Sequence, residues 1–436
     1  MHYPNARSLE TLLQQITAFS RLKHEQGAAH IVRTLAKAEL ALGACLAQLK
    51  QLPPDATKAR REPDDLRSIR LLRPMGPRRL WVKFDDAKYR RSIAGALLGR
   101  FAGCTLGVPV EGQSILSMQN LARECGGNLP PAGYWRRVYD PSHLQYGISR
   151  RENFTRAGMN GVPVDDDIAY TLLGLLTVER YGPEFTTAQI GKSWLRYLPT
   201  ACTAEKAALE NLKAGVGAMQ AAEKNNPYCE WIGAEIRADP WGYMAPGWPE
   251  LAAGMAYRDA CLSHRRNGIY GAMYFAAAIA AAFAVKDPVE ALEIGLSEIP
   301  RNCALARAVR WALHVAPRIR NYRQAREAVD RRFRDMHAVH TINNACLTIW
   351  GITIGRTDFS RVIGETVAMG LDNDCTAATA GSIVGAVVGK EGIPSRWHRP
   401  FRNKVHSYLI GKPSFKITGL QMRFALQAAK VYAAAQ

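Results

Sequence analysis

Aspartates gather in two short clusters that lie far apart in the sequence. The run 165–167 is Asp-Asp-Asp and precedes the apolar stretch 168–181, and Asp372 and Asp374 precede a second stretch that is rich in Gly and Ala. Both clusters are therefore expected at the start of a helix, where the helix dipole favours negative charge. Three adjacent carboxylates nevertheless repel each other unless protons or a cation relieve the repulsion.

Convergence of the two helix starts would bring five carboxylates into one cleft. Carboxylate oxygens are the ligands that hard divalent cations prefer. Such a cleft would favour a binuclear Mg²⁺ or Mn²⁺ centre, in which the metals orient substrate oxygens and activate water. Taken alone, the run 165–167 is also explained as solvated charge at a helix N-terminus. The spacing does not fit an EF-hand loop.

The elements that must position these residues are helices. From Tyr89 onward, apolar and small residues recur every three or four positions, and strand-like alternation is scarce. Glycines at 381, 385 and 389 would let two helix axes approach closely. Residues 112–163 are rich in Gly, Pro, Arg and Tyr and are expected to form an irregular insertion over one face. The predicted fold is all-α, a compact bundle of many helices.

The first 80 residues differ from the rest of the chain. Two helical patterns, separated near Gly27, precede a proline-rich, charged stretch over residues 51–80 that has no apolar period. We therefore expect an N-terminal helical extension with a basic linker over 1–80, and a main domain over 81–436.

The composition excludes disordered and fibrous classes, and the positive charge of the chain attracts polyanions without identifying one. The 436 residues are 47% hydrophobic and 22% charged, and 57 Lys and Arg against 38 Asp and Glu give a formal net charge of +19. Both ends of the chain are basic, and no acidic residue follows Glu391. A solvated basic surface explains this charge, and a surface that meets nucleic acid or an acidic partner is the alternative.

The cysteines and the apolar stretches indicate where in the cell the protein is expected. Nine cysteines are widely spaced without a C-x-x-C pair, which favours reduced thiols over a zinc or disulfide framework. No secretory leader is evident, and the apolar stretches 271–285 and 377–389 are too short to span a bilayer. The sequence predicts a soluble, cytoplasmic protein without a membrane partner. It leaves delivery by a leaderless secretion system open.

Three motifs in a fixed order resemble the ADP-ribosylglycohydrolase family, also described as dinitrogenase-reductase-activating glycohydrolase-like. They are GALLGRFAGCTLGVPVEG, DDDIAYTLLGLLTVERYG and GLDNDCTAATAGSIVGAVVG, and the resemblance spans about residues 89–397. It implies an orthogonal many-helix fold with two Mg²⁺ ions, or Mn²⁺, at the base of a cleft. The cleft would bind ADP-ribose by its distal ribose, and the bond at the anomeric carbon of that sugar would be hydrolysed.

The resemblance also implies roles for individual residues. The acidic pair of the family aligns with Asp166 and Asp167, although a slip of one residue stays open, and its D-x-D-T motif becomes Asp372-x-Asp374-Cys375. The implied metal ligands are Asp165, Asp166, Asp167, Asp372, Asp374 and Thr376. The implied catalytic residues are Glu111, as acid or base, together with Asp166 and Asp374. The candidate substrate-binding residues are Gly107, Ser263, His264, Gly268, Tyr270, His340, Asn343 and Asn344.

The chain departs from the family pattern at three of these positions. Cys104 stands where the family has a carboxylate, Asp165 where it has the first threonine of its motif, and Cys375 where it has a threonine. We interpret them as the mark of a divergent branch, with altered metal or substrate geometry. Loss of activity is the alternative interpretation.

Three functions are consistent with these observations. The first is a magnesium-dependent hydrolase that releases ADP-ribose from a modified protein, nucleic acid or small molecule. The second is an interaction protein on the same fold, whose residues 1–80 bind a protein partner such as an ADP-ribosyltransferase. The third is nucleic-acid binding through the basic ends of the chain, which could accompany hydrolysis.

Overall fold

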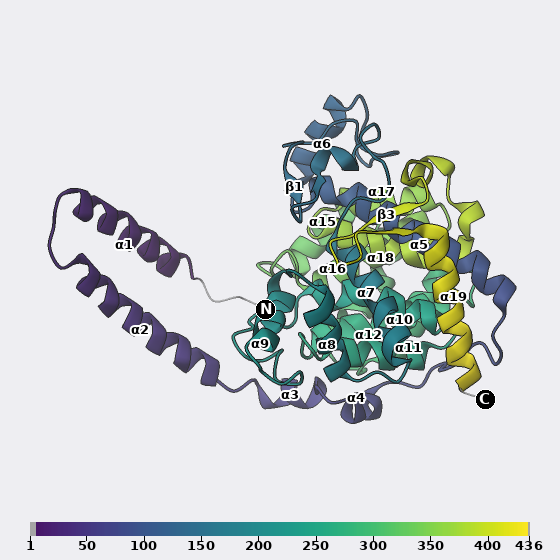
Figure 1. Ribbon diagram of the computed structural model, residues 1–436, viewed down its shortest axis with the longest axis horizontal. Coiled ribbons are helices and arrows are strands. Elements are labelled where there is room, and N and C mark those ends of the chain that lie inside the picture. Colours follow the sequence, from purple (N-terminus) through teal and green to yellow (C-terminus); the bar gives the residue numbers. More distant parts are fainter. Residues whose placement is uncertain (1–5, 435–436) are drawn as a thin grey trace. The chain divides into compact units, whose positions relative to one another are not determined.

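The structure is a computed structural model that describes residues 6–434. Within them it has nineteen α-helices and four strands of two or three residues each, so the all-α prediction is confirmed (Figure 1). The chain forms two compact units, which divide between Arg60 and Arg61.

The smaller unit is a helical hairpin. Helix α1 (Arg7–Glu25) and helix α2 (Ile31–Gln51) are joined by a turn in which Gly27 has a φ of +73°. Neither helix buries a residue, and apolar side chains such as Leu12 and Phe19 stay exposed. A short helix, α3 (Ala56–Arg61), spans the division between the units.

Residues 61–80 belong to the larger unit, whereas the sequence indicated a linker that ends at residue 80. Glu62 is buried and accepts hydrogen bonds from the amide of Ala304 (2.8 Å) and the side chain of Asn267 (3.1 Å). Helix α4 (Leu66–Leu72) buries Ile69, and Arg73 forms ion pairs with other segments of the unit. Ion pairs, the buried Glu62 and apolar side chains such as Ile69 therefore hold a stretch that lacks an apolar period.

Two antiparallel helices form the centre of the larger unit. Along α5 (Asp86–Gly107), glycines recur at every fourth residue and face α18 (Asn373–Val388). A methyl group at Gly95, Gly99 or Gly103 would overlap with the backbone of α18. The expected close approach of glycine-rich helices is therefore confirmed, and it brings the two backbones into direct contact.

The apolar character of α5 is explained by its burial. The stretch Asp86–Val110 is long and apolar enough to cross a membrane by length and composition alone, although it was not among the apolar stretches named from the sequence. Its apolar window is 94% buried within the protein, as is usual for the core helix of a globular domain. Its burial against the other helices therefore accounts for its composition.

Within the larger unit, the other helices surround this pair (Figure 1). Long helices α7, α12, α16 and α19 and shorter ones between them bury mostly Ala, Leu, Ile and aromatic side chains. Their bounds are α7 (Asp166–Tyr181), α8 (Thr187–Tyr197), α9 (Thr203–Lys213), α10 (Asp239–Met244), α11 (Pro249–Ala260), α12 (Asn267–Ala282), α13 (Pro288–Gly295), α14 (Ala304–Val315), α15 (Tyr322–Arg332), α16 (Thr341–Gly355), α17 (Phe359–Ala368) and α19 (Ile417–Ala434).

The expected insertion over 112–163 is mostly irregular. It contains α6 (Ile115–Glu124) and a hairpin of β1 (Leu144–Gln145) and β2 (Ser149–Arg150), in which Gln145 pairs with Ser149. A second hairpin, β3 (Lys404–His406) and β4 (Ser414–Lys416), lies beside the end of the insertion through the bridge between Val162 and Val405.

Substitution of Gly99 by Ala tests the contact between α5 and α18. The added methyl group would overlap with the carbonyl of Gly381, so the helices must separate. Overpacking of this kind is expected to lower the free energy of unfolding by about 1 to 3 kcal/mol, which thermal unfolding would measure. Gly419→Ala in α19 is the matched control, because its methyl group finds ordinary van der Waals room. Equal melting temperatures for the two variants would contradict the role of this contact.

Candidate active site and metal centre

Both aspartate clusters lie at helix starts, as the sequence predicts. Asp165 is the N-cap of α7, and its Oδ1 accepts a hydrogen bond from the amide of Asp167 (3.1 Å). Asp372 directly precedes α18, and Asp374 lies in the first turn of that helix. Since the backbone amides at these ends point outward, they favour negative charge at both places.

The structure brings the two clusters together. A cavity of about 330 Å³ is lined by carboxylates from four segments of the chain. They are Glu111, Asp165, Asp166, Glu205, Asp372 and Asp374, of which Glu205 forms an ion pair with Arg237. Asp167 lies fully buried next to them and does not line the cavity. The convergence that the sequence could only suggest is therefore present.

Three subsets of these groups have ligand atoms within 4.8 Å of one another, which is close enough to hold a metal ion. The first is Glu111, Asp372 and Asp374, and the second is Asp167, Asp374 and Cys375. The third is Cys104, Asp165 and Asp167. Asp167 and Asp374 each belong to two subsets, so neighbouring ions could share them.

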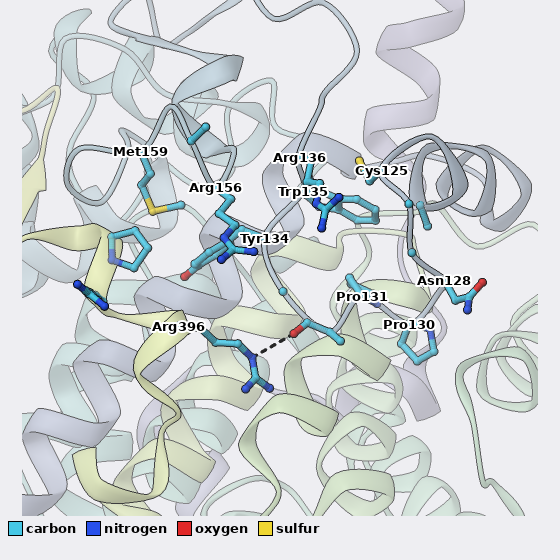
Figure 2. Close-up of a pocket in the computed structure, with 18 of the residues that line it drawn as sticks. Cys125, Asn128, Pro130, Pro131, Tyr134, Trp135, Arg136, Arg156, Met159 and Arg396 are labelled. Atoms are coloured by element: carbon cyan, nitrogen blue, oxygen red, sulfur yellow. Dashed lines mark hydrogen bonds between the residues drawn. The ribbon is translucent and has the colours of Figure 1, made fainter.

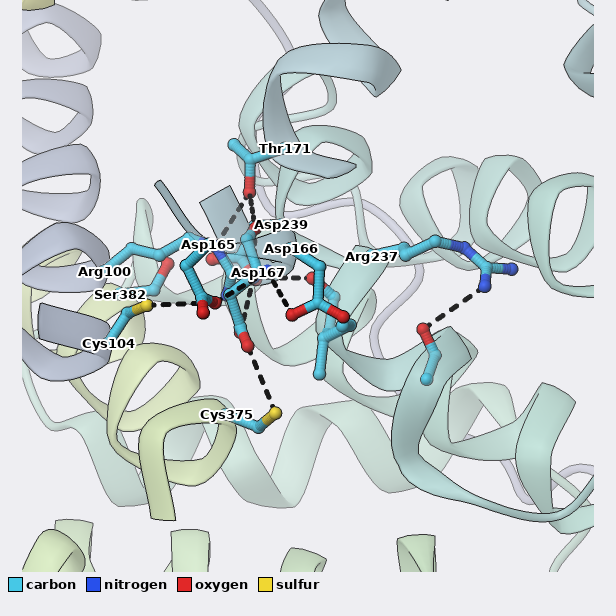
Figure 3. A network of polar contacts seen from close by, with 12 residues as sticks. Arg100, Cys104, Asp165, Asp166, Asp167, Thr171, Arg237, Asp239, Cys375 and Ser382 are labelled. Carbon is cyan, nitrogen blue, oxygen red and sulfur yellow. Dashed lines mark hydrogen bonds and ion pairs between the residues drawn. The ribbon is translucent and has the colours of Figure 1, made fainter. Parts of the chain in front are cut away.

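Arg100 compensates part of this negative charge. It comes from α5, is fully buried, and forms ion pairs with Asp167 (2.9 Å) and Asp239 (2.6 Å), as Figure 3 shows. The guanidinium also donates to Thr171 Oγ1 (2.7 Å) and to the backbone carbonyl of Ile236 (2.6 Å). This network fixes Asp167 and the first turn of α7 against α5.

The two cysteines that depart from the family pattern hold aspartates. Cys104 Sγ donates to Asp165 Oδ1 (3.3 Å), and Cys375 Sγ donates to Asp167 Oδ2 (3.1 Å) (Figure 3). Burial, together with the neighbouring aspartates, raises the pKa of both thiols well above the usual value. They are therefore protonated donors in the absence of a metal, and they orient two carboxylates of the cluster.

Burial and mutual repulsion raise the pKa values of the carboxylates. For Glu111 at the accessible edge of the cavity, desolvation and the charge of Asp166 raise the pKa to about 7. Burial first, and then the charge of Glu111, raises the pKa of Asp372 and Asp374. Without a cation, the cluster therefore keeps protons that free carboxylates would release.

The chemistry of the donors fits a hard divalent cation. Within the described residues, buried oxygens of Asp372, Asp374 and Thr376 have no hydrogen-bond partner. Unsatisfied buried oxygens beside repelling carboxylates are costly, and a bound cation would satisfy both needs. Thr376 is fully buried and follows Cys375 in α18, consistent with an oxygen donor close to the cluster.

Two of the predicted substrate-binding residues support the carboxylates instead. A side chain at Gly107 would overlap with the backbone of Asp374, so this glycine permits the contact between the end of α5 and the start of α18. Asn344 Oδ1 accepts a hydrogen bond from the amide of Asp372 (3.3 Å), and its Nδ2 donates to backbone carbonyls. Asn343 is buried and donates to the carbonyl of His337 (2.9 Å).

The other predicted substrate-binding residues are not among those that line the cavity. Ser263 is buried and accepts a hydrogen bond from Arg237 (3.0 Å), and it contacts His264 Nδ1 (2.8 Å). Gly268 packs tightly against the carbonyl of Cys229, and the hydroxyl of Tyr270 donates to the carbonyl of Pro63. His340 caps α16, and its backbone pairs with that of Trp231, which does line the cavity.

Sequence reasoning missed several residues around the carboxylates. Gln145 Nε2 donates to Asp165 Oδ2 (3.2 Å), and the hydroxyl of Tyr146 contacts Asp166. Both come from the β1–β2 hairpin of the insertion, where only the polar and aromatic residues of Leu-Gln-Tyr-Gly hint at a role. Trp231 lines the cavity and stacks on His337, with ring centroids 4.0 Å apart. Arg100 is the one charged residue in the stretch 92–107 of α5, and this isolated charge could have been noticed in the sequence.

These features define an all-α protein with a carboxylate-rich cavity between helix starts. A family model described as ADP-ribosylglycohydrolase matches residues 85–425, so the chain belongs to the ADP-ribosylglycohydrolase family. A solved structure titled "ADP-ribosylglycohydrolase-related protein complex" matches with a TM-score of 0.52 and 20% identity, over 80% of this chain and 100% of that one. At that identity it bears on the fold alone. The comparison with curated proteins returns no match.

The stability of the metal-free protein should fall as the pH rises. The folded state holds protons on Glu111 and Asp372 that the unfolded chain releases near its ordinary carboxylate pKa. The folded state is therefore favoured at low pH, and the advantage is lost as the pH climbs through the raised values. Between about pH 6 and pH 8 we expect the free energy of unfolding to fall by about 1 kcal/mol or more, mainly through the buried Asp372.

Thermal unfolding with a chelator and with Mg²⁺ measures this effect. Saturating Mg²⁺ at the higher pH should restore stability, by about 2.7 kcal/mol when its concentration is a hundred times its Kd. Asp372→Asn and Asp374→Asn, made together, should flatten the pH dependence and remove the response to Mg²⁺. A metal-free melting temperature that rises over this pH range would contradict the argument.

Proposed function

We propose that this protein is a magnesium-dependent hydrolase that cleaves the glycosidic bond at the distal ribose of ADP-ribose. The single observation that carries the proposal is the convergence of carboxylates from the end of α5, the start of α7 and the start of α18 on one cavity. Family membership supports the reaction class, since ADP-ribosylglycohydrolases release ADP-ribose from modified substrates. The acceptor to which the ADP-ribose is attached is left undefined.

Glu111 is the proposed catalytic acid or base. Its carboxyl lies at the accessible edge of the cavity, and its raised pKa of about 7 lets it hold or give up a proton near neutral pH. Glycosidic cleavage develops positive charge at the anomeric carbon, and a carboxyl group placed there can deprotonate the attacking water or protonate the leaving group. Asp166 and Asp374 line the same cavity and are proposed to act beside it.

The proposed metal ligands are the aspartates of the two helix starts, with Thr376 as a further oxygen donor. Two Mg²⁺ ions, or Mn²⁺, would supply positive charge that orients the ribose hydroxyls and lowers the pKa of water. The residues of the chain itself position the carboxylates and shape the cavity. Arg100 and the two buried cysteines hold the aspartates in place, while Gln145 and Tyr146 close the cavity over Asp165 and Asp166.

Glu111→Gln is expected to lower the rate of ADP-ribose release by about a hundredfold or more and to leave ADP-ribose binding intact. The amide keeps the shape of the side chain but does not ionise near neutral pH, so it cannot act as an acid or a base. Release would be measured from arginine-, serine-, nucleic-acid- and nucleotide-linked ADP-ribose with Mg²⁺. Glu124→Gln, at the exposed end of α6, is the control.

Calorimetry should show Mg²⁺-dependent binding of ADP-ribose to the wild type, and Asp374→Ala should abolish this binding. A wild-type protein that neither binds nor releases ADP-ribose would contradict the proposal.

A second function is favoured by the exposed apolar side chains of the helical hairpin. Leu9, Leu12 and Phe19 of α1 and Leu46 and Leu49 of α2 are all exposed. An unpartnered apolar surface of this kind is typical of a protein interaction site. In this alternative, the chain is an interaction protein whose arm binds a partner such as an ADP-ribosyltransferase.

Deletion of residues 1–60 separates the two functions. For the hydrolase, we expect the truncated protein to release ADP-ribose within about twofold of the full chain, because the larger unit has its own core. Asp374→Ala should abolish release. The opposite pattern, in which deletion abolishes the cellular function and Asp374→Ala leaves it intact, would favour the interaction protein.

A further inference from the structure

A second cavity of about 960 Å³ lies between the insertion and the C-terminal segment (Figure 2). Its walls come from three stretches, 122–136, 156–159 and 395–402. None of its lining residues also lines the carboxylate cavity. It is therefore a separate concave site in the larger unit.

Positive charge dominates this arginine cavity. Its lining includes no acidic residue and five exposed arginines, which are Arg136, Arg156, Arg396, Arg399 and Arg402. Across residues 6–434, none of these guanidinium groups forms an ion pair with a carboxylate, although arginines close by in sequence, such as Arg150 and Arg423, do. Five like charges around one hollow repel each other and attract an anion.

Neutral groups orient part of the cluster. Arg396 Nε donates to the carbonyl of Ala132 (3.1 Å) and its Nη2 to Ser360 Oγ (2.8 Å), and Figure 2 shows it facing the loop from the C-terminal side. Arg402 Nη1 donates to Asn160 Oδ1 (3.4 Å). These contacts fix two guanidinium groups without neutralising them, so the charge stays available for a ligand.

The other three arginines have guanidinium groups that are available to a ligand. Within the described residues, the side chains of Arg136, Arg156 and Arg399 make no hydrogen bond. Beneath them, the hydroxyl of Tyr134 donates to the carbonyl of Trp397 (2.7 Å), and Trp135 Nε1 donates to the carbonyl of Leu106 (2.8 Å). Both aromatic rings are buried, so they form a rigid floor and leave recognition to the guanidinium groups.

We propose that the arginine cavity binds the sugar–phosphate backbone of a single-stranded nucleic acid. A guanidinium group can donate two parallel hydrogen bonds to two oxygens of one phosphate. Five guanidinium groups offer more donors than a single phosphate can accept, which favours a ligand with several phosphates. A phosphodiester chain offers one negative charge per nucleotide, and a hollow between two segments admits one strand more readily than a duplex. The positive surface continues two residues beyond Arg402, where Lys404 pairs with Lys416 across β3 and β4 and both are exposed.

Fluorescence anisotropy of the full chain with labelled single-stranded DNA and RNA of about 20 nucleotides tests the proposal. The test variant carries the substitutions Arg136→Gln, Arg156→Gln and Arg399→Gln. They were chosen because these side chains make no hydrogen bond or ion pair with the described residues, so their replacement should not disturb the fold. The matched control removes three exposed charges elsewhere on the same unit: Arg180→Gln, Lys213→Gln and Lys286→Gln. Thermal unfolding would check that both variants are folded.

The test variant should bind at least about tenfold more weakly, and its slope of log affinity against log salt should fall by about 2, as expected for three lost phosphate contacts. The control should stay within about twofold of the wild type. Equal losses in the two variants, or no wild-type binding at about 50 mM salt, would overturn the proposal. If polyglutamate competes as well as unlabelled single strand, the ligand is an acidic protein instead. If tripolyphosphate competes equally well, the ligand is a free phosphate compound. Equal affinity for a duplex and for a single strand would overturn the single-strand preference.

Discussion

The whole arrangement depends on the backbone contact between α5 and α18. Because Gly95, Gly99 and Gly103 carry no side chain, the two helices approach until their backbones touch. At the end of this contact, Gly107 lies against Asp374, and the chain turns within four residues to Glu111. A larger residue at any of these glycines would separate the helices and, with them, the carboxylates that they carry. Close packing is thus a condition for the site as well as for stability.

That packing assembles a cluster that is unfavourable by itself. Several carboxylates lie close together in a buried cluster. Burial and the repulsion between like charges disfavour their ionised forms, which raises their pKa values. The guanidinium of Arg100 and the thiols of Cys104 and Cys375 hold the aspartates in their positions. The cluster is therefore preorganised for a cation. The cysteines, which depart from the family pattern, fill a positioning role in this structure.

The insertion connects the two cavities of the larger unit. Its β1–β2 hairpin contributes Gln145 and Tyr146 to the carboxylate cavity, while its loops around residues 122–136 and 156–159 line the arginine cavity. One cavity concentrates negative charge and the other positive charge, so they suit a cation and an anion respectively. An irregular segment can serve both sites because no regular backbone pairing constrains where its side chains point.

The sequence by itself determined the helical class, the close approach of glycine-rich helices, and the placement of Asp165–Asp167 and Asp374 at helix starts. These follow from local spacing and from the chemistry of helix ends, which act over a few residues. It could not determine that residues 61–80 pack on the larger unit, that Gln145 and Tyr146 meet the aspartates, or that Ser263 and Tyr270 do not line the cavity. Nor could it assemble five arginines from two distant segments. Contacts between residues far apart in the chain arise only when all helices pack together, so the tertiary structure alone decided them.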